Sequence, residues 1–542
     1  MSALKLVLAL AAGLALALWA QVLPEPAPVD APSTTFSALR ARRDVAWIAA
    51  TAHPVGSPAH DVVRDRLVAR LTELGLVPRL QHVDAVEVRR THARVALDNV
   101  IATRKGQGAS LPPLLVMSHY DSVVDSPGAA DDGAGVATML ELARILREQP
   151  PDRDVVFAFT DGEEIGLLGA KQLFAHEGFT HTLAAMINLD ARGGAGPTYL
   201  FELGARSDAL LAAFAKEAPH STTSSFAAFV YDRMPNGTDF TVGKQAGVPG
   251  LNFAFIADPR QYHTPLATVD ALSMSTLQHM GDQALAAVHV LSTAELPAPG
   301  PPRAWADLFA QIVVVYPAWL GWLLVAASAL LVGASYYHTP RAAGLVSGAV
   351  YIVTLLALSA LLLFVCGLIG VGRPSQYSHF AKLLASCARY ELAVALVVAS
   401  AFLLAARLVA RRTELPARVT WLGLLSLAVI VAAVLQAVAP RLAVVFAWPL
   451  LPASLALFAS KRAPWLTPIM AALVAGLVLD WGHEVYLGLG LFRPPVMAFF
   501  ALLASLGLYP LVAEVATSRH GGKLAGGLLV AGYAVALSVR VL

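Results

Sequence analysis

Histidine and aspartate side chains follow an apolar segment near residue 115 in a pattern that suits metal binding. The run 114–117 has the length of a buried strand and leads to His119 and Asp121, after which a Gly/Ala-rich loop leads to Asp131 and Asp132. In open α/β sheets, ligands bind beyond the carboxyl ends of the strands. A carboxylate often fixes the tautomer of a histidine ligand, and Asp121 is a candidate for that role. The alternative is an ordinary surface loop rich in aspartate and glycine.

Three later apolar runs end in the same way. Run 154–160 precedes Asp161 and the pair Glu163–Glu164, run 184–189 precedes Asp190, and run 248–256 precedes Tyr262 and His263. Core strands gain nothing from acidic residues at their ends, because clustered carboxylates repel one another unless a cation neutralises them. The simplest explanation is a cation that these strand ends share.

The types of these side chains favour zinc. Two histidines and several carboxylates, with no cysteine nearby, are typical zinc ligands. Five ligands and a spare carboxylate are more than one tetrahedral zinc requires, whereas two metal ions bridged by one carboxylate would use them all. The adjacent side chains of Glu163 and Glu164 point in different directions, so one can bind metal while the other holds a water as general base.

These motifs resemble those of the co-catalytic zinc aminopeptidases of the aminopeptidase Y type. The resemblance is closer still to the branch with a membrane-embedded C-terminal half, the endoplasmic reticulum metallopeptidase and vacuolar membrane protease group. It covers residues 40–295 in detail and rests on His119-Tyr120-Asp121-Ser122, Gly128-Ala129-Ala130-Asp131-Asp132-Gly133, Asp161-Gly162-Glu163-Glu164, Asn188-Leu189-Asp190 and Tyr262-His263-Thr264.

The resemblance implies a complete set of ligands for two zinc ions per chain. Position by position, His119 and Glu164 correspond to ligands of one zinc, and Asp190 and His263 to ligands of the other. Asp131 would bridge the two ions. No ligand of the family's set is missing from the sequence.

The resemblance also implies an activity and a fold. Glu163 would be the general base, and Asp121 would orient His119. The protein would be a membrane-bound zinc metallopeptidase, an aminopeptidase that hydrolyses N-terminal peptide bonds. Its catalytic part would be an α/β sandwich of the zinc-aminopeptidase type with a mixed central sheet, which the alternation of strand-like and helical runs also predicts.

Two other functions remain open at the level of sequence. A glutaminyl cyclase-like aminoacyltransferase would share the fold but use a single zinc; the membrane segments and Gly166-Leu167-Leu168-Gly169 after the glutamate pair favour a peptidase. A non-catalytic membrane scaffold with a peptidase fold is the second alternative, and the complete ligand set opposes it.

The composition is that of a membrane protein. Of 542 residues, 57% are hydrophobic and only 14% charged, and the mean hydropathy is +0.62. The net charge of +2, without a basic patch interleaved with aromatic residues, predicts no nucleic-acid partner. The expected partners are a peptide substrate and the lipid bilayer.

Composition divides the chain into three parts. We expect residues 1–22 to form an N-terminal transmembrane anchor, for which a cleaved signal peptide is the alternative. We expect residues 35–295 to form the peptidase domain that the resemblance implies, and a Pro-rich linker at 293–303 to separate it from an all-α polytopic transmembrane domain at 304–542.

The last part contains about eight apolar runs long enough to cross a hydrocarbon core of ~30 Å. They lie near 308–333, 345–371, 390–410, 419–438, 441–460, 466–490, 494–516 and 524–541. If every run crosses, one side carries Arg341, Arg411, Arg412, Arg418, Lys461, Arg462, Arg519 and Lys523, and the other only Arg373, Lys382, Arg389, Arg441 and Arg493. The positive-inside rule makes the first side cytoplasmic and places the peptidase domain in the periplasm of a bacterial inner-membrane protein, or in a eukaryotic lumen.

Five further residues near the motifs also fit purely structural roles. Asp132 fits a helix N-cap, and Asp161 fits a strand terminus beside the base. Asp239 fits a helix cap or a carboxylate that faces the site. Arg192 fits a contact with a substrate carboxylate or a structural ion pair, and Tyr262 fits a donor to the oxyanion or a packing residue.

Overall fold

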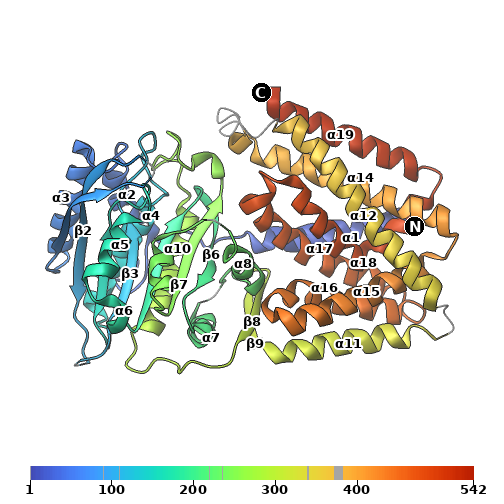
Figure 1. Ribbon diagram of the computed structural model, residues 1–542, viewed down its shortest axis with the longest axis horizontal. Coiled ribbons are helices and arrows are strands. Elements are labelled where there is room, and N and C mark those ends of the chain that lie inside the picture. Colours follow the sequence, from blue (N-terminus) through green and yellow to red (C-terminus); the bar gives the residue numbers. More distant parts are fainter. Residues whose placement is uncertain are drawn as a thin grey trace. The chain divides into compact units, whose positions relative to one another are not determined.

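The computed structural model describes residues 2–89, 91–108, 110–218, 220–234, 236–337, 341–371 and 383–541, so that Arg373 and Lys382 lie outside the described residues. The chain forms two compact units (Figure 1). One comprises Val22–Pro302 and Ala310–Val315, and it is called the catalytic unit below. The other comprises Met1–Gln21, Arg303–Phe309 and Tyr316–Leu542, and it is called the helical unit.

The catalytic unit is built on a mixed sheet, as predicted. In the described part of the chain, its seven strands lie in the order β1-β2-β4-β3-β5-β7-β6. The strands are β1 (Arg79–Glu87), β2 (Arg94–Arg104), β3 (Leu114–His119), β4 (Val155–Thr160), β5 (Ala185–Ala191), β6 (Ala195–Leu203) and β7 (Gly250–Ala257). The four central strands β4, β3, β5 and β7 run parallel to one another. The outer strands β1, β2 and β6 pair with their neighbours in antiparallel orientation. Parallel strands bring their carboxyl ends to one edge of the sheet.

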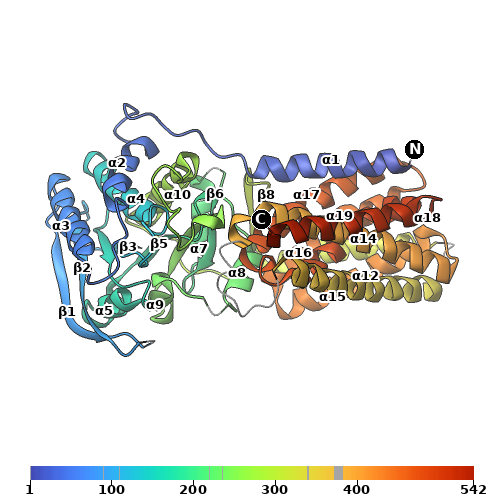
Figure 2. The ribbon, with the colours of Figure 1, turned by 90° about the horizontal axis from the view of Figure 1, so that it is seen from above.

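Helices cover both faces of this sheet, which explains the sequences of its central strands. Every residue of β3, β4 and β5 is buried, and strands buried on both faces read as continuous apolar runs. Helices α4 and α10 pack on one face, and α5 and α9 on the other (Figure 2). The helices of the unit are α2 (Ala38–Ile48), α3 (Pro58–Glu73), α4 (Gly133–Glu148), α5 (Leu168–His176), α6 (Phe179–Thr182), α7 (Asp208–Glu217), α8 (Ser225–Tyr231), α9 (Asp239–Gln245) and α10 (Met274–Leu291).

The segment at 86–95, whose pattern is strand-like, is divided between two strands in the structure. The alternation of apolar and polar residues at 86–95 predicts a single strand, but β1 ends at Glu87 and β2 begins at Arg94. A turn joins them, closed by hydrogen bonds from the amides of Val88 and His92 to the carbonyls of Ala93 and Val88. The alternation therefore continues through a hairpin turn, and only tertiary pairing reveals the break. Strand β6, at the edge of the sheet, was not anticipated.

The helical unit contains long apolar helices, as expected for a multi-pass membrane protein. Within the described ranges, eight helices are long and apolar enough to cross a membrane. This number includes the N-terminal helix, so the described C-terminal part has fewer such helices than the sequence predicted. The eight helices correspond to α1 (Ser2–Ala20), α12 (Arg341–Gly370), α14 (Cys387–Thr413), α15 (Ala417–Val438), α16 (Pro440–Ala459), α17 (Leu466–Val485), α18 (Met497–Thr517) and α19 (Gly521–Val541). The predicted run 308–333 is shorter than expected, because strands β8 (Arg303–Leu308) and β9 (Ile312–Pro317) precede a shorter apolar helix at Ala318–Ala334 that includes α11 (Gly321–Ala334).

Truncating a side chain in the middle of the sheet should destabilise the catalytic unit. Leu115 in β3 is fully buried in a cluster with Met117 and Phe240, so Leu115→Ala should cost about 2–5 kcal/mol and lower the thermal unfolding midpoint of the full-length protein. Val62→Ala is the control, because Val62 is 65% exposed. An equal midpoint for both variants would contradict the assigned core.

Candidate metal centre

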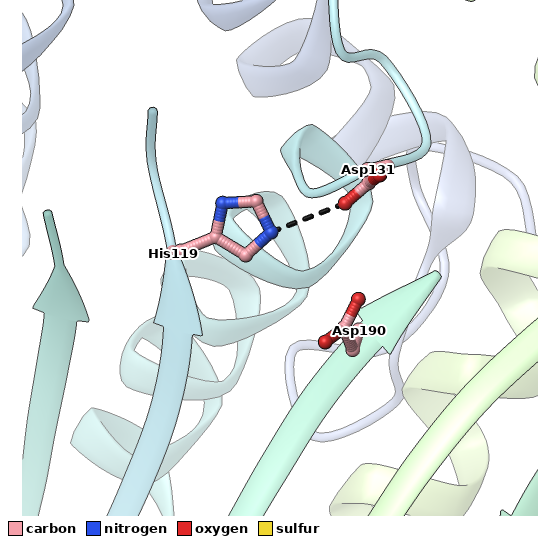
Figure 3. Close-up of side chains that lie close together, drawn as sticks. All are labelled: His119, Asp131 and Asp190. Carbon is pink, nitrogen blue, oxygen red and sulfur yellow. Dashed lines mark hydrogen bonds and ion pairs between the residues drawn. The ribbon is translucent and has the colours of Figure 1, made fainter. Parts of the chain in front are cut away.

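Adjacent strands bring the first three candidate ligands together at the carboxyl edge of the sheet. His119 is the last residue of β3, and Asp190 lies near the end of its parallel neighbour β5. Asp131 comes from the loop between β3 and α4, and Figure 3 shows all three side chains directed toward a common space. His119 Nε2 lies 3.1 Å from Asp131 Oδ1. One ligand atom from each residue lies within 4.8 Å of the others.

A second group shares Asp131. Asp131, Glu164 and His263 also offer ligand atoms within 4.8 Å of one another. His263 Nε2 lies 3.1 Å from Asp131 Oδ2 and 3.1 Å from Glu164 Oε2. Asp131 therefore presents Oδ1 to the first group and Oδ2 to the second, the arrangement of a carboxylate that bridges two metal ions.

The structure groups the five ligands differently from the sequence-based expectation. His119 lies with Asp190, and Glu164 lies with His263, whereas the expected pairs were His119 with Glu164 and Asp190 with His263. The reason is the strand order, which places β3 directly beside β5. The order of the strands along the chain does not predict that β3 lies beside β5, so the grouping of the ligands could not be predicted from the sequence.

Buried polar atoms without hydrogen bonds support metal binding by these residues. Asp131 and Asp190 are only 8% and 9% exposed. Among the described residues, Glu164 Oε1 is buried without a hydrogen-bond partner, and His263 Nε2 has only its ion-pair contacts at 3.1 Å with Asp131 and Glu164. Unsatisfied buried polar atoms are costly, and a cation between the carboxylates would satisfy them. The nitrogen and oxygen donors are those that zinc accepts.

Burial and mutual repulsion shift the pKa values of these side chains. Burial and the charge of Asp131 raise the pKa of Asp190 to about 8. Burial also raises the pKa of Asp131, but hydrogen bonds with His119 and His263 outweigh it and hold that pKa at about 2. Burial lowers the pKa of His263, but the carboxylates of Asp131 and Glu164 raise it to about 10. Without a metal ion, protons on Asp190 and His263 therefore reduce the repulsion.

Asp121 connects the first ligand to the predicted base. His119 Nδ1 lies 3.0 Å from the backbone carbonyl of Asp121 and 3.4 Å from its carboxylate Oδ1. The two carboxylate oxygens accept hydrogen bonds from the amides of Glu163 (3.1 Å) and Glu164 (3.3 Å). Asp121 thus contacts His119 as expected, and it also anchors the turn that carries the glutamate pair. Burial raises the pKa of Glu163 well above its ordinary value, and Asp190 and Asp239 raise it further.

The structure distinguishes between several interpretations left open by the sequence. Asp132 caps α4 by accepting a hydrogen bond from the amide of Gly135 at 3.1 Å. Thr238 is the N-cap of α9, whereas Asp239 accepts a hydrogen bond from Thr160 Oγ1 and acts electrostatically on Glu163. Asp239 therefore contacts the end of β4 instead of capping α9.

Two aromatic and cationic contacts lie beside the second group. The ring of Tyr262 stacks on the ring of His263, with centroids 3.8 Å apart and an interplanar angle of 22°. The guanidinium of Arg192 lies 5.6 Å from the centroid of Tyr262. Tyr262 thus packs on a candidate ligand, as the simpler of its two interpretations predicted.

Sequence reasoning missed His60. Asp161, interpreted as a strand terminus, forms a buried ion pair in which His60 Nε2 lies 2.8 Å from Asp161 Oδ1. His60 precedes Asp161 by 101 residues, and nothing in its surroundings in the sequence marks it as a neighbour of the glutamate pair.

The sequence of the catalytic unit resembles known proteins. Residues 99–288 match the family described as Peptidase family M28. Endoplasmic reticulum metallopeptidase 1 of Rattus norvegicus is 30% identical over 235 residues, which make up 42% of this chain and 26% of that protein. Vacuolar membrane protease of Kluyveromyces lactis is 30% identical over 261 residues, 44% of this chain and 28% of that protein. The chain thus matches only about a quarter of the length of these relatives.

Solved structures give matches over about half of the chain. An aminopeptidase from Aneurinibacillus sp. strain AM-1 is 17% identical with a TM-score of 0.40, and the match covers 50% of this chain and 97% of that one. A glutaminyl cyclase from Porphyromonas gingivalis is 21% identical with a TM-score of 0.39, and the match covers 47% of this chain and 98% of that one.

Zinc affinity should increase with pH between 6 and 8. Zinc must displace the protons held by Asp190 (pKa about 8) and His263 (pKa about 10), so each pH unit should raise the affinity at least about tenfold. Both pKa values lie above those of the unfolded chain, so their contribution to stability falls as the pH rises. The zinc-free protein should therefore unfold at a lower temperature at pH 8 than at pH 6, and zinc should stabilise it more at pH 8.

Thermal unfolding with and without zinc at the two pH values measures both effects. Asp282→Asn is the matched control, because burial raises the pKa of Asp282 to about 6 in α10, away from the ligands. This variant should keep the pH dependence of zinc binding. If the zinc affinity is the same at pH 6 and pH 8, zinc does not displace protons from Asp190 and His263, and the prediction is wrong.

Proposed function

We propose that the protein, whose residues 99–288 match Peptidase family M28, is a membrane-anchored zinc aminopeptidase with two zinc ions per chain. The observation that carries the proposal is the position of Asp131, whose two carboxylate oxygens face two separate ligand groups. Relatives named as a metallopeptidase and a membrane protease support the same class of reaction.

The five converging side chains would hold the two ions. His119 and Asp190 would bind one, Glu164 and His263 the other, and Asp131 both. When bound, zinc acts as a Lewis acid toward the scissile carbonyl and lowers the pKa of a coordinated water toward neutrality. His263 is 34% exposed, so the second group is the more accessible of the two to a peptide.

Glu163 would move the proton during hydrolysis. Its carboxylate accepts the proton of the attacking water while the water oxygen bonds to the carbonyl carbon of the peptide. The same side chain then delivers this proton to the departing amine as the carbon–nitrogen bond breaks. The raised pKa of Glu163, caused first by burial, suits a group that both accepts and returns a proton. Asp121 holds the amide of Glu163 in place through its carboxylate.

The charge of the site suits a peptide with a free N-terminus. Asp190 and Asp239 are both buried, and each raises the pKa of Glu163 electrostatically. Asp239 belongs to neither ligand group and would remain available to attract an N-terminal ammonium group, whereas an acetylated N-terminus carries no such charge. Charge complementarity therefore favours cleavage from the N-terminal end.

Removing the carboxylate of Glu163 should abolish turnover and spare the metal. Glu163→Gln should lower kcat by about 10²–10⁴-fold and leave the zinc content unchanged, because Glu163 belongs to neither ligand group. Glu164→Gln is the matched comparison, since it removes a ligand and should lower the zinc content as well. Aminoacyl reporter hydrolysis and elemental analysis of the full-length protein measure both quantities.

The same assay distinguishes the alternatives. An aminopeptidase cleaves reporters with free N-termini, is inhibited by a chelator, and does not act on acetylated reporters. Cyclisation of peptides with N-terminal glutamine at one zinc per chain would indicate a glutaminyl cyclase-like enzyme instead. A protein that neither binds zinc nor acts on any peptide would be a scaffold, and full activity of Glu163→Gln would remove Glu163 from the mechanism.

We also propose that the catalytic unit lies outside the cytoplasm. The bias of basic residues toward one set of loops supports this orientation, and Lys461, between α16 and α17, belongs to the basic side. In a bacterium the protein would then lie in the inner membrane with its catalytic unit in the periplasm.

Thiol labelling should report this orientation. A membrane-impermeant maleimide should label Val62→Cys, at a position 65% exposed in the catalytic unit, in cells whose inner membrane is intact. Lys461→Cys should react only after lysis. The native thiols of Cys366 and Cys387 are buried and should stay unlabelled. The reverse pattern would place the catalytic unit in the cytoplasm.

A further inference from the structure

The turn between β4 and α5 carries both the proposed base, Glu163, and a candidate ligand, Glu164. Small displacements of this turn would therefore affect proton transfer and metal binding together. The two glutamates are held by the carboxylate of Asp121, which accepts hydrogen bonds from both of their amides. Asp161 is the first residue of the turn after β4.

Asp161 is fixed at both carboxylate oxygens. The residue is fully buried. Its Oδ1 lies 2.8 Å from His60 Nε2, and its Oδ2 accepts a hydrogen bond of 2.8 Å from the amide of Asp98. Its backbone amide donates to the side chain of Asn99 at 2.9 Å. Of these partners, only His60 can carry a charge that compensates the buried carboxylate.

His60 also contacts the strand end that carries the first ligand. It lies in the first turn of α3, is 3% exposed, and stacks on Tyr120 with ring centroids 4.9 Å apart and an interplanar angle of 17°. Tyr120 stands between His119 and Asp121, and its hydroxyl donates to the carbonyl of Asp98 at 2.8 Å. One buried imidazole thus contacts residues that adjoin both halves of the metal centre.

We propose that His60 is a positioning residue: its hydrogen bond to Asp161 sets the place of the turn that carries Glu163 and Glu164. The proposal rests on the proposed function and adds to it a residue outside the region that matches the peptidase family. Burial lowers the pKa of His60, but the hydrogen bond and charge of Asp161 raise it above its ordinary value, which is consistent with a charged pair.

Two substitutions separate the hydrogen bond from the ring. His60→Phe keeps an aromatic ring against Tyr120 but removes the donor to Asp161. We expect it to lower kcat by about 10–100-fold and to weaken zinc binding by about tenfold, with KM little changed. His60→Gln keeps a donor without charge and should lose less, about threefold to tenfold in kcat. Full-length, zinc-loaded protein is used for the kinetics, and competition with a chelator measures zinc affinity.

A second buried histidine provides the matched control. His279 in α10 is 2% exposed and accepts a hydrogen bond of 2.9 Å from the amide of Thr198. His279→Phe should lower the thermal unfolding midpoint but leave kcat and zinc affinity of the folded protein near their wild-type values. An equal loss of activity in His279→Phe and His60→Phe would show that any buried histidine has this effect, and would overturn the proposal.

Other outcomes are equally decisive. Wild-type kcat and zinc affinity in His60→Phe would overturn the proposal, as would a larger loss in His60→Gln than in His60→Phe. If His60→Phe does not fold, a folded His60→Gln with wild-type values for both quantities would overturn it. If the wild-type protein binds zinc but cleaves no peptide, only the aminopeptidase proposal is wrong. The zinc affinities of the His60 variants would still test the role of His60.

Discussion

The repulsion among buried carboxylates is the constraint on which the rest of the catalytic unit depends. Asp131, Glu164 and Asp190 converge at one edge of the sheet within the reach of a metal ion, and the charges of Asp190 and Asp239 raise the pKa of Glu163. Such a cluster costs free energy in any folded protein unless cations or protons neutralise it. The two histidines add ligand nitrogens but cannot balance the whole charge. The surrounding structure must therefore be rigid enough to hold the carboxylates together until metal binds.

The sheet provides this rigidity. The central strands are buried on both faces, and their parallel arrangement brings His119 and Asp190 side by side. Around the strand ends, hydrogen bonds hold the loops that supply the other groups: Asp121 binds the glutamate turn, and Asp132 caps α4. The ligands thus lie on or beside elements whose positions are determined by packing, which is how precise metal sites are generally built.

The convergence of the five candidate ligands could be predicted from the sequence because four of them closely follow an apolar run, and Asp131 follows the Gly/Ala-rich loop beyond the first run. Their binding of zinc stays a prediction. Their grouping could not be predicted, since it depends on β3 lying beside β5. His60 was missed for a related reason: its partner, Asp161, is 101 residues away, and a histidine in a helical segment has many ordinary roles. Asp239 carried an ambiguous signal, because an acidic residue at the start of a helix fits capping as well as a site-facing role. Local patterns identified the elements, and tertiary contacts determined how their side chains meet.

The central claim is that two metal ions draw five scattered side chains into one centre bridged by Asp131. Crystals of the zinc-loaded protein, with anomalous diffraction recorded on both sides of the zinc absorption edge, test this most directly. The account predicts two zinc peaks, one within bonding distance of His119 and Asp190 and the other within bonding distance of Glu164 and His263, with Asp131 touching both. A single peak, or peaks bound by other residues, would contradict it.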